Sequence, residues 1–423
     1  MRAREEKGIF YGWWVILALS LVAFFGPMGR YLLTPLFPFI EREMGWSREA
    51  IGTAFTIHFW LYALISLWTG HLVDTIGGRK TIFIGGVILL VGLPILSLSR
   101  ALWQVYLIFG VFLAFGISMT HFVPNTSIAR KWFVRKAGLA TGLVIVGTSL
   151  GFGILTPIIS YVCDLTGWRI TTLLCGLLFG TAVMAMALFV IRSTPESMGL
   201  WPDGVAPVPV PKGSESLLEI SAEPRGPMSP ALRSREFWAL FVAYSVIGVA
   251  LQGILAHIVM WAVDLGAEPG GAGIFMAALT LPSIPIRVLG GWLGDRFGKR
   301  KVLMIFNCIT GLIWLGGWAF VGNPLSLLIF AIALGLAYGT PFSLYTPLLG
   351  DIFGRASVGS LMGMLTFGHG LLGGLGAFLF GWIADLTGSY GLACPVSAAC
   401  YLISVIGLGL TQGSPRDRGG LVH

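Results

Sequence analysis

Charged residues are scarce in this sequence. Asp, Glu, Lys and Arg together make up 11% of the 423 residues, whereas 56% are hydrophobic. A water-soluble domain of this size needs far more charge to solvate its surface. The composition therefore excludes an ordinary soluble protein, and it predicts that most of the chain faces lipid or other buried helices.

Several signatures of cofactor chemistry are also absent. The five cysteines form no CxxC pair, so we expect neither a disulfide framework nor a metal site. The sequence contains no Walker phosphate loop, and its Gly-x-Gly patterns lie inside apolar runs, so we expect no ATP drive and no cofactor. No nucleophile and base occur together in a supporting context, and an enzyme is therefore not expected.

What the chain has in abundance is long apolar runs. Most of them are long enough to cross the hydrocarbon core of a membrane as a helix, which takes about 20 residues. Twelve can be drawn, at roughly 12–38, 48–72, 81–99, 103–129, 138–162, 169–191, 237–262, 271–294, 302–321, 325–349, 358–384 and 390–411. The predicted fold class is an all-α membrane protein with twelve transmembrane helices.

The basic residues are distributed unevenly between the two faces of this predicted membrane protein. Of the 27 Lys and Arg residues, 21 fall on one face: the N-terminal tail, the even-numbered loops and the C-terminal tail. The exceptions are Arg42, Arg48, Arg100 and Arg169 on the other face and Arg30 and Arg287 within spans. This bias predicts a cell (inner or plasma) membrane protein with both termini cytoplasmic. The net charge of +8 is then explained by topology and anionic lipid, not by nucleic acid.

One eleven-residue phrase occurs twice, 221 residues apart. The first copy, GHLVDTIGGRK, spans Gly70–Lys80, and the second, GWLGDRFGKRK, spans Gly291–Lys301. The tetrapeptide Asp-Leu-Thr-Gly recurs with the same offset, at Asp164–Gly167 and Asp385–Gly388. A constant offset of just over half the chain predicts two related halves of six helices each, arranged as a parallel repeat.

The repeat and one polar stretch suggest the domain boundaries. We expect an N-terminal six-helix domain at 1–192, a cytoplasmic connector at 193–235, a C-terminal six-helix domain at 236–412 and a tail at 413–423. The connector contains PVPVPK, and Pro-rich segments of this kind act as tethers.

The repeated phrase resembles the cytoplasmic loop signature of the major facilitator superfamily, G-x-L-x-D-x-x-G-x-[RK]-[RK]. Its glycines, Gly77 and Gly298, would let the chain turn sharply. Its aspartates could accept hydrogen bonds from a helix N-terminus or from an Arg across the seam between the halves. Such a latch would favour the state closed to the cytoplasm, while the basic residues would also enforce orientation. The expected gate residues are Asp74, Arg79, Lys80, Asp295, Arg300 and, from a neighbouring loop, Arg135.

A second resemblance is narrower. The segment WFVRKAGLATGLVIVGTSLG, from Trp132 to Gly151, is similar to the span 5 entry signature of the monocarboxylate transporter family. Tyr11-Gly12-Trp13-Trp14 resembles that family's N-terminal signature, although it lacks the acidic residue before Gly12. The resemblance implies two six-helix domains around a central cavity and rocker-switch transport of a small monocarboxylate.

Arg287 lies deep in span 8, eight residues before Asp295. A helix rises about 1.5 Å per residue, which puts Arg287 roughly 12 Å from the end of the span. A charge at this depth is costly unless it faces a polar cavity or a partner, and a guanidinium offers a planar fork for a carboxylate. Arg287 matches the span 8 arginine with which the monocarboxylate transporters bind substrate, so we expect it to bind the anion.

The sequence departs from the animal members of that family in two places. They have an Asp one turn before the span 8 arginine, where this chain has Ser283, and a span 1 Lys that is absent here. Proton coupling therefore needs another group. Our candidates are His257 in span 7, which could face the same site as Arg287, and His121 in span 4, since histidine changes charge near neutral pH. A histidine hydrogen-bonded within the bundle is the competing interpretation.

Further substrate contacts are expected from polar and aromatic residues within spans. Asn125 is an amide at a depth where lipid cannot satisfy it, and it follows His121 by one helical turn. Tyr338 and Tyr345 are two turns apart in span 10. The expected substrate-binding set is Arg287, Asn125, Tyr338, Tyr345, Phe342, Phe367 and Arg30.

These features together predict proton-coupled symport of a lactate- or pyruvate-like monocarboxylate by a chain that functions as a monomer. One alternative is an exchanger resembling the oxalate/formate antiporters, which pair two opposed basic residues around a dicarboxylate. Span 11 here offers only His369, and a neutral histidine is a poor second anchor. Another alternative is a membrane sensor that binds the anion without net flux.

Overall fold

The computed structural model describes residues 10–205, 231–353 and 358–411, and every regular element in these residues is a helix. The first half contains α1 (Tyr11–Phe25), α2 (Met28–Tyr31), α3 (Leu33–Met44), α4 (Arg48–Thr75), α5 (Gly78–Ser97), α6 (Leu102–Val105), η1 (Tyr106–Phe112), α7 (Leu113–Thr120), α8 (Phe122–Trp132), α9 (Ala137–Ala185), η2 (Met186–Val190), η3 (Pro195–Met198) and η4 (Pro202–Gly204). The second half contains α12 (Arg235–Asp264), α13 (Ile274–Thr280), α14 (Ser283–Phe297), α15 (Lys299–Phe320), α16 (Pro324–Phe353), α17 (Val358–Thr387) and α18 (Ala393–Gly409).

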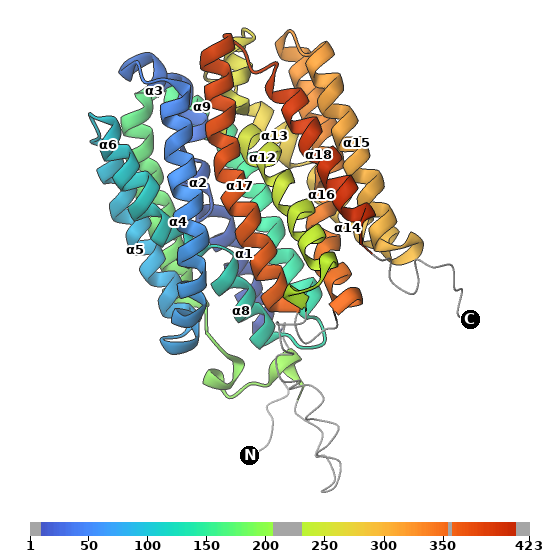
Figure 1. Cartoon of the computed structure of the whole chain (residues 1–423). Coiled ribbons are helices and arrows are strands. Elements are labelled where there is room, and N and C mark those ends of the chain that lie inside the picture. Colours follow the sequence, from blue (N-terminus) through green and yellow to red (C-terminus); the bar gives the residue numbers. More distant parts are fainter. Residues whose placement is uncertain (1–9, 206–230, 354–357, 412–423) are drawn as a thin grey trace, which may run out of the picture. The chain divides into compact units, whose positions relative to one another are not determined.

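The predicted all-α membrane fold is confirmed. Ten helical stretches of the described residues are long and apolar enough to span a membrane, and α18 is a shorter apolar helix. One of the ten stretches, Gly138–Val190, contains two spans, because the chain turns at Gly167 with φ 80° and ψ 160°. The described residues therefore supply the twelve helical crossings that the apolar runs predicted, coloured along the chain in Figure 1.

The turns of the two repeated phrases adopt the same backbone geometry. Gly77 between α4 and α5 has φ 88°, and Gly298 between α14 and α15 has φ 94°. The two copies of the tetrapeptide end alike, with φ 80° at Gly167 and 70° at Gly388. Residues with a Cβ rarely adopt this left-handed region. The prediction that glycine permits sharp turns in the repeated phrase is thus confirmed.

Span 4 is not one continuous helix. It runs through α6, the π-helical η1 and α7, and then breaks at His121, whose φ of −97° and ψ of −132° are not helical, before α8 begins. A break leaves carbonyl groups of the preceding turn without their helical partners. The Asn125 side chain satisfies one of them, since its Nδ2 donates to the Thr120 carbonyl at 3.0 Å.

The chain divides into two compact units that do not follow the sequence midpoint. Unit 1 comprises the described residues of Met1–Leu32, Leu64–Leu155 and Thr166–Pro209. Unit 2 comprises Leu33–Ala63, Thr156–Leu165 and the described residues of Val210–His423. Unit 2 therefore contains the described second half together with parts of spans 1, 2 and 5.

Within unit 2, α12 and α17 pack side by side along much of their length (Figure 1). Both helices finish at the same end, where Asp264 and Asp385 approach Arg48 at the start of α4. We call this the far end of unit 2. At the opposite end, the near end, the start of α15 meets the last residues of α18.

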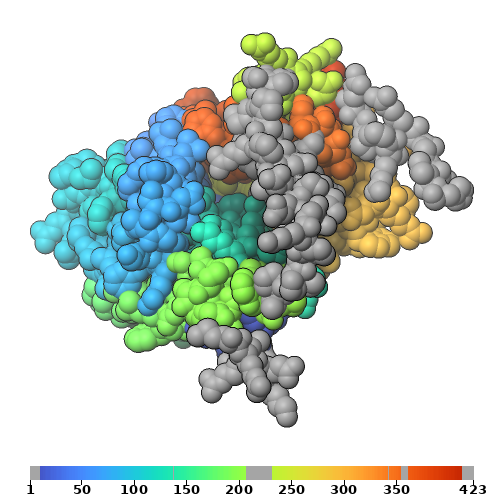
Figure 2. Space-filling view, turned by 90° about the horizontal axis from the view of Figure 1, so that it is seen from below, coloured from blue at the N-terminus to red at the C-terminus, as the bar shows by residue number. Residues whose placement is uncertain are grey.

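Unit 1 joins the two segments that resemble the monocarboxylate transporter signatures. The Trp13 and Phe133 rings lie 4.6 Å apart between centroids, and the Tyr11 and Trp132 rings 5.7 Å apart. The Trp132 indole donates to the Arg192 carbonyl at 2.8 Å. The segment that follows Arg192, green in Figure 2, contains η4, and η4 contacts α8. Four aromatic residues of the two signatures therefore pack together in unit 1: Tyr11, Trp13, Trp132 and Phe133.

Candidate functional site

Arg287 projects from α14 in the interior of unit 2. The helix begins at Ser283, directly after Pro282, and the Arg287 side chain is half-buried with its Nε fully enclosed. Gly339 on α16 makes room for it, because a Cβ at Gly339 would lie 3.3 Å from Arg287 Cγ. The neighbouring helix thus supports the aliphatic stem of Arg287 while leaving the guanidinium to polar surroundings.

Those surroundings include Tyr244 of α12, a residue that sequence reasoning missed. The Tyr244 phenol lies within electrostatic range of the Arg287 guanidinium. Its ring packs between Tyr345, at 4.7 Å between centroids, and His369, at 4.9 Å. Tyr244 therefore joins side chains from α12, α14, α16 and α17 into one cluster, which we call the Arg287 cluster.

His369 is held in one orientation by the backbone of α12. Its Nδ1 lies 3.0 Å from the Tyr244 carbonyl oxygen, which can only accept a hydrogen bond. A neutral His369 in this position therefore carries its hydrogen on Nδ1. The basic nitrogen of this imidazole is then Nε2.

The two predicted tyrosines of α16 are both hydrogen-bonded inside unit 2. Tyr338 donates to Ser283 Oγ at 3.3 Å, and Tyr345 contacts Ser404 Oγ at 3.4 Å. Ser404 in turn accepts from Asn307 Nδ2 at 2.9 Å. Tyr338 thus reaches the first residue of the helix that carries Arg287, whereas Tyr345 bridges the Arg287 cluster to α15 and α18.

Of the two predicted apolar wall residues, the structure describes the side chain of Phe367 but not that of Phe342. Phe367 is half-buried on α17, two residues before His369. Phe342 belongs to α16, but its side chain lies outside the described part of the structure.

Unit 1 gathers a second set of predicted site residues around the break in span 4. Arg30 is only 7% exposed and lies within electrostatic range of His121. Asn125 is 1% exposed, and while its Nδ2 holds the Thr120 carbonyl, its Oδ1 meets no hydrogen-bond donor among the described residues. Unit 1 therefore supplies a cation from α2, and an imidazole and an available amide acceptor from the break in span 4.

The arginines of the repeated phrase bind helix ends in their own halves. Arg79 donates to the carbonyls of Ala187 and Leu188, with 2.8 Å from Nε and 2.7 Å from Nη2. Arg300 donates to the carbonyls of Leu408 and Gly409, again at 2.8 and 2.7 Å. Each pair of acceptors is offset by the same 221 residues as the arginines. Both arginines therefore donate to carbonyls in the last turn of a helix, where the backbone lacks its regular helical donors.

The other predicted gate residues lie mostly at the surface. Asp74, Lys80 and Asp295 are exposed. Arg135 donates its backbone N–H to Asp203 Oδ2 at 2.8 Å. Burial opposes ionisation of Asp203, but the backbone N–H groups of residues 134–136 outweigh it and hold the pKa of Asp203 below its ordinary value. A latch between the halves through Asp74 or Asp295 stays a prediction.

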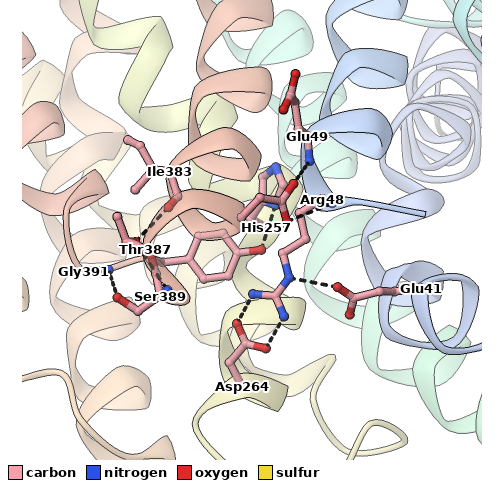
Figure 3. Close-up of polar contacts among 11 residues, drawn as sticks. Glu41, Arg48, Glu49, His257, Asp264, Ile383, Thr387, Ser389 and Gly391 are labelled. Carbon is pink, nitrogen blue, oxygen red and sulfur yellow. Dashed lines mark hydrogen bonds and ion pairs between the residues drawn. The ribbon is translucent and has the colours of Figure 1, made fainter. Parts of the chain in front are cut away.

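His257, the predicted proton-coupling residue, lies near the far end of unit 2. It follows Tyr244 by 13 residues on one continuous helix, which separates the two by about 20 Å. Its Nε2 donates to the Ala377 carbonyl at 2.8 Å. Its Nδ1 accepts from the Tyr390 hydroxyl at 3.0 Å (Figure 3). His257 and the Arg287 cluster therefore occupy different parts of unit 2.

An ionic network that sequence reasoning missed surrounds Tyr390 at the far end. The Arg48 guanidinium pairs with Asp264 through both terminal nitrogens, at 2.7 Å for Nη2, and with Glu41 through Nε at 2.9 Å (Figure 3). Arg48 also lies 5.5 Å from the centroid of the Tyr390 ring. Burial holds the pKa of Tyr390 well above its ordinary value, so its hydroxyl keeps the proton that it donates to His257.

The signal for this network was present in the repeated tetrapeptide. Asp385, its first residue in the second copy, accepts from the backbone N–H groups of Arg48 and Glu49 at 3.3 and 2.7 Å. We used the tetrapeptide only as evidence of a repeat. Among the described residues, no group of three His, Cys, Asp or Glu side chains could hold a metal ion.

Comparison with known proteins places this geometry in context. The family model of the Major Facilitator Superfamily matches residues 19–268 and 246–420. The chain is 27% identical to monocarboxylate transporter 13 of Bos taurus over 79% of its own length and 74% of that protein. It is 25% identical to the oxalate:formate antiporter of Oxalobacter formigenes, covering 89% of this chain and 88% of that one.

Among solved structures, the chain resembles the crystal structure of the nucleoside transporter NupG. The TM-score is 0.69, with 93% of this chain and 99% of that one covered. At 15% sequence identity, this likeness concerns the fold alone.

Proposed function

The chain belongs to the Major Facilitator Superfamily, and we propose that it is a proton-coupled symporter of a small, lactate- or pyruvate-like monocarboxylate. In this proposal it sits in the cell membrane with both termini cytoplasmic, works as a monomer and moves its substrate by rocker-switch alternating access. Membership of this family makes the protein a membrane transporter and not an enzyme. The substrate and the coupling are the parts that need testing.

The anion site of the proposal is Arg287. The observation that carries it is a guanidinium deep in a span, with the Tyr244 phenol of another span within electrostatic range. The described acidic residues of the second half stand at or beyond the ends of helices. A cation at such depth is stabilised by a counter-anion, and a carboxylate fits the guanidinium fork in two parallel hydrogen bonds. The Tyr244 hydroxyl offers a further donor near the same anion.

The proton site of the proposal is His369 rather than His257. The His369 ring packs against Tyr244, the residue that faces Arg287, and its basic nitrogen is Nε2. An arriving carboxylate attracts a proton to a nearby imidazole by Coulomb interaction. One proton carried with one monocarboxylate keeps the cargo neutral. His257 has both ring nitrogens engaged at the far end and is better suited to a structural role.

Support for a monocarboxylate substrate comes from the relatives that are named monocarboxylate transporters. The oxalate:formate antiporter is also a relative, so anion exchange is the alternative function. Exchangers of that kind hold the substrate between two fixed cations, and within unit 2 His369 would have to be charged to act beside Arg287. The two functions thus differ in when His369 is protonated. In symport the proton binds His369 together with the substrate, whereas in exchange His369 stays protonated throughout the cycle.

The test is uptake of radiolabelled lactate into proteoliposomes with and without an inward proton gradient. We expect gradient-driven accumulation, lost in Arg287→Gln and not restored by Arg287→Lys, because Lys is a point charge without the planar fork. Arg100→Gln, which removes an exposed cation outside the cluster, serves as the matched control.

Two other results would redirect the assignment. Exchange that requires a preloaded anion and ignores the proton gradient would replace symport by antiport. Binding of lactate without flux in either format would point to a sensor. Arg287→Gln with parental uptake would remove the anion site altogether.

A further inference from the structure

Asp385 caps a helix that belongs to the other half of the sequence. It stands near the end of α17, and its two carboxylate oxygens accept from the first backbone N–H groups of α4, those of Arg48 and Glu49. These N–H groups have no partner within their own helix. A carboxylate there satisfies two of them and interacts favourably with the positive end of the helix dipole. The contact joins spans 11 and 2 across 337 residues of sequence.

The first copy of the tetrapeptide stands in the equivalent place. Asp164, near the end of span 5, lies so close to Gly270 that a Cβ there would be 2.8 Å from the carboxylate Oδ2. Gly270 lies in the turn that leads into α13 and span 8. Residues 49 and 270 differ by 221, as do residues 164 and 385. The two aspartates therefore face equivalent positions of the repeat, one in the first turn of α4 and the other in the turn that precedes α13.

The backbones below these aspartates cross in the same repeated manner. A Cβ at Gly52 would lie 2.6 Å from the Ala377 carbonyl oxygen, and a Cβ at Gly273 would lie 2.6 Å from the Thr156 carbonyl oxygen. Both pairs are again related by the offset of 221. Real Cβ contacts essentially never fall below 3.0 Å. Each crossing therefore needs glycine, and each holds its helices at backbone contact.

One crossing carries an ionic clamp that the other lacks. Arg48 pairs with Glu41 and Asp264 beside the Asp385 contact, with only 16% and 20% of the Arg48 and Asp264 side chains exposed. The residue equivalent to Arg48 in the other crossing is Pro269, which has no charge. Thr56 adds a hydrogen bond to the Gly374 carbonyl at 2.6 Å on the clamped side.

We propose that the two aspartates of the repeated tetrapeptide, Asp385 and Asp164, are the latches of the gate at the far end of unit 2. This inference rests on the alternating access of the proposed function. In the closed far end, each aspartate ties the end of one span to the start of a span from the other half. Opening of the far end breaks both ties and hydrates the exposed N–H groups, so the latches set how readily the far end opens.

Two native cysteines at the far end report on this gate. Cys394 at the start of α18 is 0% exposed, and Cys163, next to Asp164, is 1% exposed. We would measure maleimide labelling of each by mass spectrometry in lipid nanodiscs, with hydrogen exchange of residues 48–56 as a second readout. We expect Asp385→Asn to raise both rates on the order of tenfold, because it weakens two charge-assisted hydrogen bonds. Asp164→Asn should raise the labelling of Cys163 more than that of Cys394.

The matched control is Asp351→Asn, which removes the carboxylate that pairs with Lys299, the first residue of α15, at 2.6 Å. It should leave labelling at the far end unchanged. Parental labelling and exchange in both Asp385→Asn and Asp164→Asn would overturn the latch. Labelling needs no substrate, so faster labelling in a chain that never transports lactate would support the latch while removing the proposed function.

Discussion

The arginines of the repeated phrase and the aspartates of the repeated tetrapeptide differ in the half of the chain that they contact. Arg79 and Arg300 bind carbonyls at helix C-termini within their own halves, through contacts that match to 0.1 Å or better. Asp385 instead accepts from the first N–H groups of a helix of the opposite half, and Asp164 lies against the turn that precedes another such helix. The sequence repeat alone does not distinguish the two cases, because both follow one offset.

The difference matters for a transporter that alternates between two states. Contacts inside one half can persist through the whole cycle, so they contribute to stability at every step. Contacts between halves must break when the far end opens, so they contribute to the balance between states. Variants of the arginines and of the far-end crossings should therefore separate stability from gating.

The largest effect is expected from the glycine crossing. In Gly52→Ala the new Cβ would lie 2.6 Å from the Ala377 carbonyl oxygen, and overpacking of this kind costs about 1–3 kcal/mol. That cost falls on the closed far end alone. We expect uptake to fall roughly tenfold, as a barrier change of about 1.4 kcal/mol implies, with a smaller change in thermal stability.

Gly363→Ala is the matched control for this substitution. Gly363 is also a helical glycine of unit 2, but a Cβ there would meet nothing within 4 Å. Equal loss of uptake in both variants would show that the crossing has no special role and would remove the contrast between the two motifs.

The next largest effect is expected on stability, from the arginines. Arg300→Ala deletes two charge-assisted hydrogen bonds to the Leu408 and Gly409 carbonyls. A loss of about 2 kcal/mol in the free energy of unfolding follows, measured as a lower melting temperature in detergent. Cys394 labelling in the folded protein should stay at the parental rate.

Lys301→Ala provides the comparison for that variant, since Lys301 is the adjacent exposed cation of the same phrase. Its melting temperature should match that of the parent. A strong increase in Cys394 labelling in Arg300→Ala would contradict the separation, because it would make the arginine part of the gate.

The fold could be predicted from the sequence far better than the site. Apolar runs of span length and one constant offset determine twelve crossings in two halves. The break at His121 could not be seen, because it depends on Asn125 binding the Thr120 carbonyl, a contact that no periodicity reports. Tyr244 was missed because an aromatic residue inside an apolar span has the same pattern whether it packs or faces Arg287.

The far-end network escaped prediction for a different reason. Arg48 and Asp264 lie at the ends of their spans, 216 residues apart, and charges at span ends normally indicate only topology. The tetrapeptide did carry the information, because an acidic residue at a repeated helix end needs a repeated partner. Its partner is a helix N-terminus, which has no side-chain signature.

A smaller effect is expected from the ionic clamp at the clamped crossing. Arg48→Ala should weaken the closed far end by about 1 kcal/mol, because the pair with Asp264 is partly exposed and screened. Faster labelling of Cys394 would report it. The charge-reversed double variant Arg48→Asp with Asp264→Arg should recover part of the protection, whereas each single reversal should label faster than Arg48→Ala. No recovery in the double variant would show that Arg48 acts through packing alone.

The smallest effect is expected at Asp203. It binds backbone N–H groups within one half of the chain, so its contact can persist through the whole transport cycle. Its pKa is held below the ordinary value, so the ionised carboxylate stabilises the folded state. That contribution is complete above the ordinary aspartate pKa of about 4 and disappears as the pH falls through the lower folded pKa. We therefore expect Asp203→Asn to lower the melting temperature slightly and equally from pH 8 to pH 5, and to approach the parent only in stronger acid. If the difference in melting temperature between Asp203→Asn and the parent varied between pH 8 and pH 5, a group other than Asp203 would be responsible. Faster Cys394 labelling in Asp203→Asn would show that this contact affects the opening of the far end.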